Sequence, residues 1–149
     1  MKIYDCFMFF DEEMLLDLRL NVLNEYVDKF VITEATYMHS GKPKKLLFDI
    51  NKFPKFKDKI IYQVIDKLPQ NIETIHEKDK DEKDTRGQKL ANNSNKREHY
   101  QRDMGQESKV ILKNADPNDI ILIGDVDEIP NLEKINFKNI KNKFLFRLR

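Results

Sequence analysis

The sequence contains little of several features on which common protein classes depend. Cys6 is its only cysteine, so an intrachain disulfide is impossible, and its position in an apolar run predicts a buried thiol. Only four glycines occur, and no Gly-rich loop of the Walker type is present, so a bound phosphate would need a metal ion or cationic side chains. No apolar run approaches the ~18 residues that span a bilayer.

The chain also lacks an excess of charge of one sign. Lysine and arginine total 27 against 26 aspartates and glutamates, and the net charge of +1 argues against nucleic acid as a partner. The N-terminal MKIYDCFMFF has no small-residue cleavage site and is typical of a first strand rather than a signal peptide. We therefore expect a single soluble, cytoplasmic domain over residues 1–149, without a membrane anchor.

Apolar runs alternate with helical patterns along the chain. After the first run, Leu15, Leu18, Val22 and Tyr26 recur at helical spacing, which predicts a helix with this face buried. A second helical pattern covers residues 97–114. Strands alternating with helices predict an α/β fold, a Rossmann-like three-layer sandwich with a mostly parallel central sheet. The predicted strands are residues 2–10, 29–36, 59–66, 119–124 and 144–148.

Residues 77–95 differ in composition from the rest of the chain. An unbroken run of charged residues extends from Glu77 to Asp84, and a cluster of asparagines follows it. Such a run is typical of a solvated helix face or a loop. We interpret residues 77–95 as a charged and polar loop insertion.

The segment DIILIGDVDEIP, residues 119–130, is the most informative part of the sequence. An apolar strand leads directly into Asp125 and Asp127, and side-chain alternation in an extended strand would place both carboxylates on the same side. Paired carboxylates at a strand end suit Mg²⁺ or Mn²⁺ carrying a phosphorylated substrate. The alternative is an ordinary polar turn.

Two enzyme classes use a hydrophobic strand followed by Asp-x-Asp. In a haloacid-dehalogenase-type phosphatase, Asp125 would be the nucleophile and Asp127 the general acid. That motif normally lies near the N-terminus, whereas little sequence follows Asp127, and Ile129 fits the phosphatase pattern poorly. In a nucleotide-sugar transferase, the pair would hold a metal ion that neutralises the departing diphosphate.

Four blocks identify a family resemblance. In order, they are YDCFMFFDE, FVITEATYMHSGKPK, REHYQR and IGDVDEIP, which begin at residues 4, 30, 97 and 123. Together they resemble glycosyltransferase family 17, which includes the β-1,4-mannosyl-glycoprotein β-1,4-N-acetylglucosaminyltransferases. The resemblance implies a GT-A fold and a metal-dependent, inverting transfer of a sugar from a nucleotide sugar, such as UDP-N-acetylglucosamine, to a glycan acceptor.

The resemblance also implies roles for individual residues. Asp125 and Asp127 match the metal and diphosphate motif, which Glu128 and Pro130 complete. Phe9, Phe10 and Asp11 end the first strand, where GT-A enzymes bind the nucleotide base, although the two phenylalanines could equally belong to the core. Glu34 ends the second strand and could accept a hydrogen bond from uracil.

Two further blocks supply cationic candidates. His39, Ser40, Gly41 and Lys42 match a family block at the active-site face, where Lys42 could contact an anionic group. Arg97 and Arg102 precede the aspartate strand, and a guanidinium can clamp a diphosphate. Arg102 is the preferred candidate, with a surface ion pair to Glu98 or Asp103 as the alternative role.

The resemblance leaves the general base unassigned. Family catalytic domains continue past the strand that follows IGDVDEIP, so we expect this chain to be truncated. Glu128 or an aspartate is the candidate we name for the base. A non-catalytic nucleotide-sugar-binding module therefore remains the alternative to a complete transferase.

Overall fold

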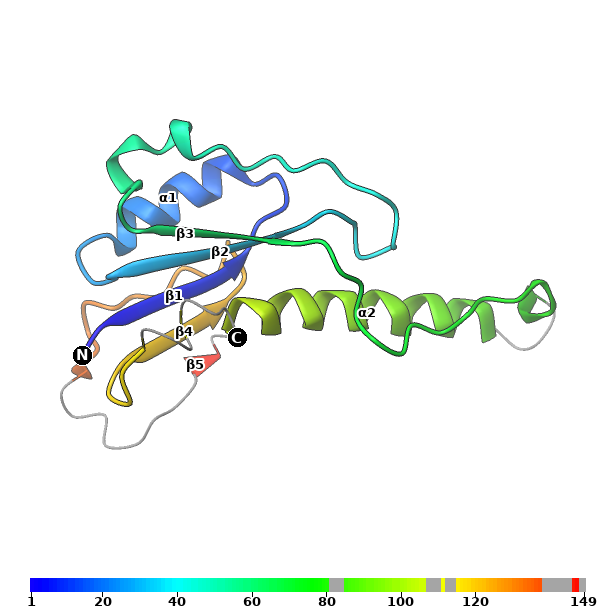
Figure 1. Cartoon of the computed structure of the whole chain (residues 1–149). Coiled ribbons are helices and arrows are strands. Elements are labelled where there is room, and N and C mark those ends of the chain that lie inside the picture. The colour runs from blue at the N-terminus through cyan, green and yellow to red at the C-terminus, as the bar shows by residue number, and fades with distance from the viewer. Residues whose placement is uncertain (81–84, 107–110, 112–114, 138–145, 148–149) are drawn as a thin grey trace.

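A computed structural model describes residues 1–80, 85–106, 111, 115–137 and 146–147 of the chain. The strands form a single sheet in the order β3-β2-β1-β4-β5, and every neighbouring pair is parallel (Figure 1). The elements in chain order are β1 (Ile3–Met8), α1 (Glu13–Leu23), β2 (Lys29–Ala35), η1 (Ile50–Lys52), η2 (Pro54–Phe56), β3 (Ile60–Ile65), η3 (Glu77–Lys80), α2 (Thr85–Gln106), β4 (Ile120–Gly124) and β5 (Phe146–Arg147), where η marks a 3₁₀ turn.

Helices cover both faces of this sheet. Phe7 of β1 packs in the same core cluster as Leu16 and Leu20 of α1, whereas Cys6 belongs to a second cluster with Val31 on the other face. The second face meets α2, which contacts β1 and β2. The predicted three-layer α/β sandwich with a parallel sheet is confirmed, because alternation along the strands supplies apolar side chains to both faces.

Cys6 is buried, as predicted, at 2 % exposure. Burial in this apolar cluster raises the pKa of its thiol, with a smaller contribution from the neighbouring Asp5 carboxylate. The thiolate is therefore suppressed at neutral pH, which suits a packing role rather than a nucleophilic one.

The buried face of α1 differs from the predicted one. Leu16, Leu20 and Leu23 are fully buried, whereas Leu18 and Val22 are about half exposed. Both sides of this helix carry apolar residues, so periodicity alone could not choose between them. Arg19 also lies on the buried side, an uncommon place for a charged residue.

The interpretation of residues 77–95 as a loop is wrong for its second half, since α2 begins at Thr85. Residues 67–80 and the first half of α2, residues 85–96, project together beyond the sheet; we call them the arm (Figure 1). Asn93 exchanges two 2.8 Å hydrogen bonds with the backbone of Glu73, and Lys89 pairs with Asp79 at 2.8 Å. Polar contacts thus fix this part of the helix, which explains the lack of an apolar pattern.

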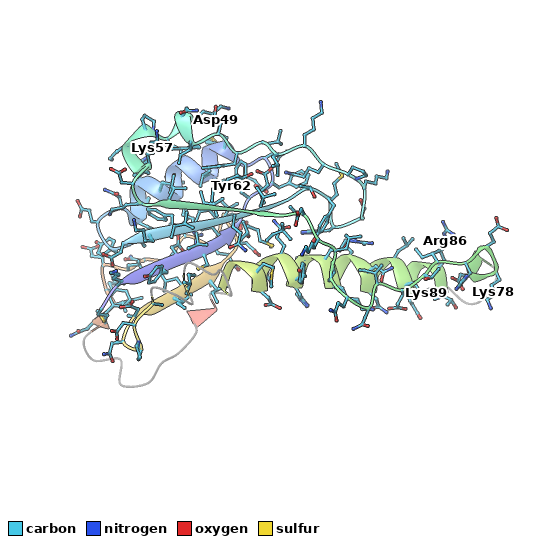
Figure 2. All side chains as sticks on the ribbon, in the orientation of Figure 1. Asp49, Lys57, Tyr62, Lys78, Arg86 and Lys89 are labelled. Atoms are coloured by element: carbon cyan, nitrogen blue, oxygen red, sulfur yellow. The ribbon has the colours of Figure 1, made fainter. Side chains whose placement is uncertain are left out.

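Figure 2 shows Lys78, Arg86 and Lys89 at the end of the arm, remote from the sheet. The second half of the predicted helix, residues 107–110 and 112–114, lies outside the described residues, as do 144, 145 and 148 of the last predicted strand. Among the helices of the described segments, none has the length and apolar character needed to cross a membrane.

Candidate functional site

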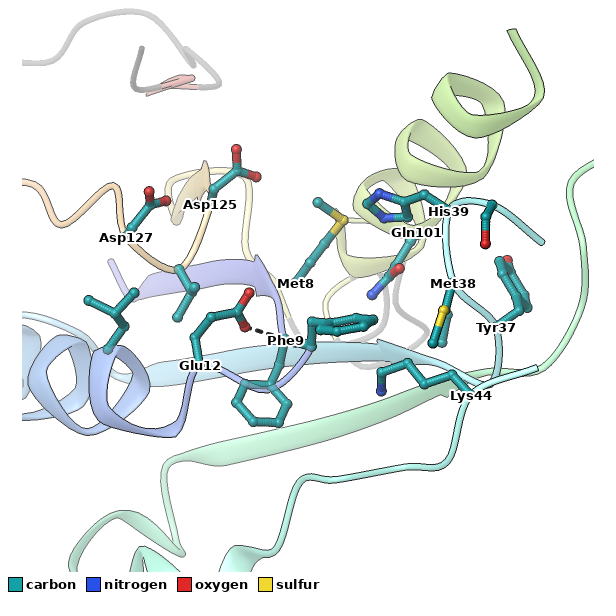
Figure 3. Close-up of a pocket in the computed structure, with 15 residues that line it drawn as sticks. Met8, Phe9, Glu12, Tyr37, Met38, His39, Lys44, Gln101, Asp125 and Asp127 are labelled. Carbon is teal, nitrogen blue, oxygen red and sulfur yellow. Dashed lines mark hydrogen bonds between the residues drawn. The ribbon is translucent and has the colours of Figure 1, made fainter. Parts of the chain in front are cut away.

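A cavity of about 500 Å³ opens at the carboxyl ends of β1 and β4 (Figure 3). β1 and β4 are neighbours in the sheet, but the chain leads from β1 to β2 on one side and from β4 to β5 on the other. Ligands of open parallel sheets gather at such a switch point. The wall comes from the loop after β1, residues 37–44, α2 and the turn after β4.

Asp125 and Asp127 line one end of this cavity. β4 ends at Gly124, and the N–H of Glu128 donates to the carbonyl of Asp125 at 3.0 Å, so the two aspartates lie in a turn. The predicted alternation along a strand is therefore wrong as the reason for their placement. The turn still brings both carboxylates to the same rim (Figure 3).

Arg102 of α2 reaches this rim. Its Nη2 lies 2.7 Å from Oδ1 of Asp125 and 3.1 Å from Oε1 of Glu98, one turn earlier on the helix. Its Nε is buried and has no hydrogen-bond partner in the part of the chain that the structure describes. The ion pair with Glu98, the alternative role considered for Arg102, is therefore present, and the same guanidinium also contacts Asp125.

Arg19 of α1 supports the same turn from inside the protein. Its Nε and Nη2 each donate to the carboxylate of Asp5 at 2.8 Å, and both side chains are fully buried. Its Nη1 donates to the carbonyls of Asp125 at 2.7 Å and Glu128 at 2.9 Å, with Val126 at 3.3 Å. The sequence prediction missed this residue, because arginine inside a helical pattern is normally solvated.

The other end of the cavity combines aromatic and apolar side chains with polar and cationic ones (Figure 3). Phe10, which is 41 % exposed, and Met38 stand there beside Tyr37, and Gln101 of α2 donates from Nε2 to the carbonyl of Thr33 at 3.2 Å. An apolar wall with a few polar groups is the usual lining of a small-molecule site. The cavity therefore joins an anionic end to an aromatic end.

Comparison with known proteins decides the family. The family model of glycosyltransferase family 17 matches residues 1–145. The chain belongs to glycosyltransferase family 17. No match was found among curated proteins or among solved structures. Membership supports a sugar-transferring enzyme with a nucleotide sugar and an acceptor as partners, and it leaves no reason to assign phosphatase chemistry to Asp125.

In this family 17 chain, a divalent cation at the turn would have Asp125 and Asp127 as its protein ligands. Within the described residues, no group of three or more His, Cys, Asp or Glu side chains is arranged to bind a metal ion. Asp125 and Asp127 together fit a cation that completes its coordination shell with substrate phosphate and water, the usual arrangement for Mg²⁺. The exposed Asp127 carboxylate has no hydrogen bond within the described segments and is available for this role.

Glu128 does not line the cavity. Its Oε2 accepts a 2.9 Å hydrogen bond from the backbone N–H of Asp125 and would lie 3.1 Å from a Cβ added at Gly124. The Glu128 carboxylate is thus bonded to the backbone of its own turn, so Glu128 does not suit the role of general base considered from the sequence. Glycine at position 124 leaves room for this contact.

Glu34 is also placed differently from the prediction. It is fully buried and does not line the cavity. Its carboxylate pairs with Lys44 and accepts hydrogen bonds from the N–H groups of Leu47 and Phe48 and from the Tyr62 hydroxyl. Because its own chain supplies these donors, we interpret Glu34 as the residue that fixes the 44–48 segment rather than as a contact to uracil. Burial, and then this hydrogen bond, raise the pKa of Tyr62.

Arg97 fixes the turn that carries the His-Ser-Gly-Lys block. Its Nη1 donates to the carbonyl of His39 at 2.9 Å, and a Cβ at Gly41 would lie 2.7 Å from its Nη2. Gly41 has a φ of 89°, a region that favours glycine. His39 and Ser40 line the cavity, but Arg97 and the exposed Lys42 do not, so the structure does not bring these two cations to the site.

Lys44 and Glu12 are the charged residues among the cavity residues that were not predicted. Lys44 Nζ lies 5.1 Å from the centre of the Phe10 ring, while Glu12 Oε2 accepts hydrogen bonds from the N–H groups of Phe10 and Asp11 at 3.0 and 3.2 Å. Asp11 itself is exposed and does not line the cavity. Glu12 and Lys44 are the last residues of two recognised blocks. Membership of a block carried no indication of these contacts, which depend on how the loop after β1 folds back.

Proposed function

We propose that this family 17 protein binds a nucleotide sugar in the cavity together with Mn²⁺ or Mg²⁺ and transfers the sugar, with inversion, to a glycan acceptor. A UDP-sugar is the donor class we propose, with UDP-N-acetylglucosamine to be tested first. The resemblance to a family that includes N-acetylglucosaminyltransferases supports this choice of sugar.

One observation carries the proposal. A single cavity at the switch point of the sheet combines two carboxylates at one end with an aromatic wall at the other. A nucleotide diphosphate has the matching polarity, since its base is flat and stacks on aromatic rings and its diphosphate needs cations. The base would lie toward Phe10, and the diphosphate toward Asp125 and Asp127.

The residues of the anionic end have separate roles in this proposal. Asp125 and Asp127 would hold the cation through carboxylate oxygens, and a bound cation would neutralise the charge that develops on the departing diphosphate. Arg102, adjacent to Asp125, would add a fixed positive charge for the same phosphates. Glu128 and Arg19 would keep the turn in place.

Inverting transfer forms a bond between an acceptor oxygen and the anomeric carbon while the bond from that carbon to the diphosphate breaks on the opposite face. The acceptor proton must pass to a base. Among the described residues lining the cavity, the carboxylates are Glu12, Asp125 and Asp127. Asp125 and Asp127 are assigned to the cation, and Glu12 accepts two backbone hydrogen bonds, so we assign the base to none of them.

This lack of an assigned base is the observation that favours the second candidate, a nucleotide-sugar-binding module without turnover. Both candidates require the same donor site. They differ only in whether the bound donor is consumed, and the test below separates them.

The test measures thermal stabilisation and donor turnover with UDP-, GDP- and CMP-sugars, each with and without Mn²⁺. We expect a UDP-sugar with Mn²⁺ to raise the melting temperature, since ligand at 100 times Kd stabilises by about 2.7 kcal/mol. Asp127→Ala should abolish the metal-dependent part of this shift. Release of UDP in the presence of glycan acceptors would support the transferase.

Glu25→Ala is the matched control, because this exposed carboxylate follows α1 at the opposite end of the strands from the cavity. It should leave the shift unchanged. Metal-dependent stabilisation that survives Asp127→Ala would overturn the site assignment. Stabilisation without UDP release would favour the binding module.

A further inference from the structure

A buried guanidinium connects the three elements that surround the anionic end of the cavity. Arg19 belongs to α1, its carboxylate partner Asp5 to β1, and its three carbonyl partners to the turn 125–128 after β4. The side chains of Arg19 and Asp5 have 0 % exposure. The guanidinium carbon also lies 4.7 Å from the centre of the Phe7 ring.

The geometry uses every nitrogen of the guanidinium. Two nitrogens hold Asp5 in a bidentate pair, while Nη1 alone reaches the carbonyls of the turn. Lysine has a single side-chain nitrogen on a flexible stem. It cannot reproduce a planar guanidinium that donates to a carboxylate on one side and to backbone carbonyls on the other. The bond to the Val126 carbonyl is buried and those to Asp125 and Glu128 are part-buried, so carbonyls left without this donor would cost free energy.

The carbonyls that Arg19 holds flank the proposed metal ligands. Asp125 contributes both a carbonyl to Arg19 and a carboxylate to the cavity, and Asp127 lies between the bonded residues Val126 and Glu128. Holding three peptide groups of one turn therefore limits where the two carboxylates can lie. Some residues do not bind the metal but hold its ligands in place through hydrogen bonds. Removing such a residue commonly weakens metal affinity 10- to 100-fold.

We propose that Arg19, anchored by Asp5, is the positioning residue of the Asp125–Asp127 turn and thereby sets the metal affinity of the site. Its effect on metal affinity rests on the proposed function, whereas its effect on the conformation of the turn does not. Arg19 acts from the core and touches neither cation nor donor. A merely structural role would lower stability without changing the site of the folded protein.

The experiment measures two properties of Arg19→Lys at a temperature where circular dichroism shows the variant to be folded. The first is the Mn²⁺ dissociation constant, followed by electron paramagnetic resonance of the free ion with and without UDP. The second is hydrogen exchange of the turn amides of Asp125, Glu128 and Ile129, which donate to Glu128 Oε2 and to the carbonyls of Asp125 and Asp127. We expect about tenfold weaker Mn²⁺ binding and faster exchange of these three amides, with the β1–β2 amides unchanged.

Phe30→Leu is the control, because Phe30 is fully buried at the start of β2, the opposite end of the sheet. It should lower the melting temperature without changing Mn²⁺ affinity or exchange in the turn. If Arg19→Lys does not fold, the double variant Asp5→Leu with Arg19→Met takes its place, because it removes both members of the buried pair and leaves no single charge buried. This double variant should show the same weaker Mn²⁺ binding and faster exchange in the turn.

Unchanged Mn²⁺ affinity and unchanged turn exchange in a folded Arg19 variant would overturn the proposal. Equal site defects in Phe30→Leu would overturn it as well, since they would reflect general destabilisation. If the wild type bound no Mn²⁺ while Arg19→Lys still loosened the turn, the proposed function would fail and the positioning role would stand.

Discussion

At the scale of single residues, the contact between Arg102 and Asp125 links α2 to the anionic rim. The 2.7 Å pair is partly exposed on the side of Asp125, and the Nε of Arg102 is buried without a partner among the described residues. A buried donor without an acceptor is uncommon and calls for a partner such as water or a ligand. A diphosphate bound near Asp125 would supply further acceptors.

We therefore predict that Arg102→Ala weakens UDP binding in the presence of Mn²⁺ by about 10- to 100-fold, because a charge-assisted hydrogen bond contributes about 1.5–3 kcal/mol. Isothermal titration calorimetry with UDP and Mn²⁺ measures this change. Arg86→Ala is the control, since Arg86 is exposed in the arm on the same helix. Unchanged UDP affinity in Arg102→Ala would contradict a phosphate-binding role.

The placement of site residues was predictable where it follows from position along the chain. Asp125, Asp127 and Phe10 follow strands that end at one edge of a parallel sheet, and all three line the cavity. Glu34 also ends a strand, but its outcome depended on donors from residues 44–62 that fold back over it. The role of Arg19 depended on carbonyls more than a hundred residues away. Such long-range pairing has no periodic pattern in the sequence.

At the scale of elements, the arm is held by polar contacts on α2. Asp79 accepts a hydrogen bond from Lys89, which lowers the pKa of Asp79, helped by the N–H of His76. Lys96 likewise lowers the pKa of Glu73. A carboxylate with a depressed pKa in the folded state stabilises it above the pKa of the unfolded chain, and this contribution is lost as pH falls through the folded value.

We predict that the arm stays ordered from neutral pH down to about pH 5 and loosens below about pH 4, where unfolded carboxylates titrate. Amide resonances of residues 85–96, followed by NMR from pH 7 to pH 3, should change before those of β1 and β2. Lys89→Met should loosen the arm already at pH 7 and reduce the pH dependence of its amide resonances. Lys78→Met, at the same exposed end of the arm, should do neither. Loss of sheet and arm resonances in one step would contradict a separate role for these contacts.

At the scale of the whole molecule, the architecture was predictable because it follows from short-range patterns. Apolar runs separated by helical segments predict parallel strands, and the rule that ligands bind at strand carboxyl ends then places the site. The sheet order and the depth of the cavity depend on how β4 lies against β1, which the sequence does not encode locally. The two ends of the sheet therefore differ: buried side chains such as Phe30 pack at the amino ends of the strands, and the cavity lies at their carboxyl ends.

This division predicts opposite consequences for two phenylalanines. Phe30 is fully buried at the start of β2, with its ring centre 6.5 Å from that of Phe56, so Phe30→Ala should lower the free energy of unfolding by about 3–5 kcal/mol in urea titrations. Phe10 is 41 % exposed at the cavity, so Phe10→Ala should change stability by less than about 1 kcal/mol.

Nucleotide binding should show the reverse pattern. Phe10→Ala removes the aromatic wall on which the base would stack, an interaction of about 0.5–1.5 kcal/mol, so UDP affinity should fall about three- to tenfold. Folded Phe30→Ala should bind UDP as the wild type does, because its side chain lies at the opposite end of the strands from the cavity. Equal losses of affinity in both variants would mean that stability and binding are coupled through the sheet, and the base would then have to be sought away from Phe10.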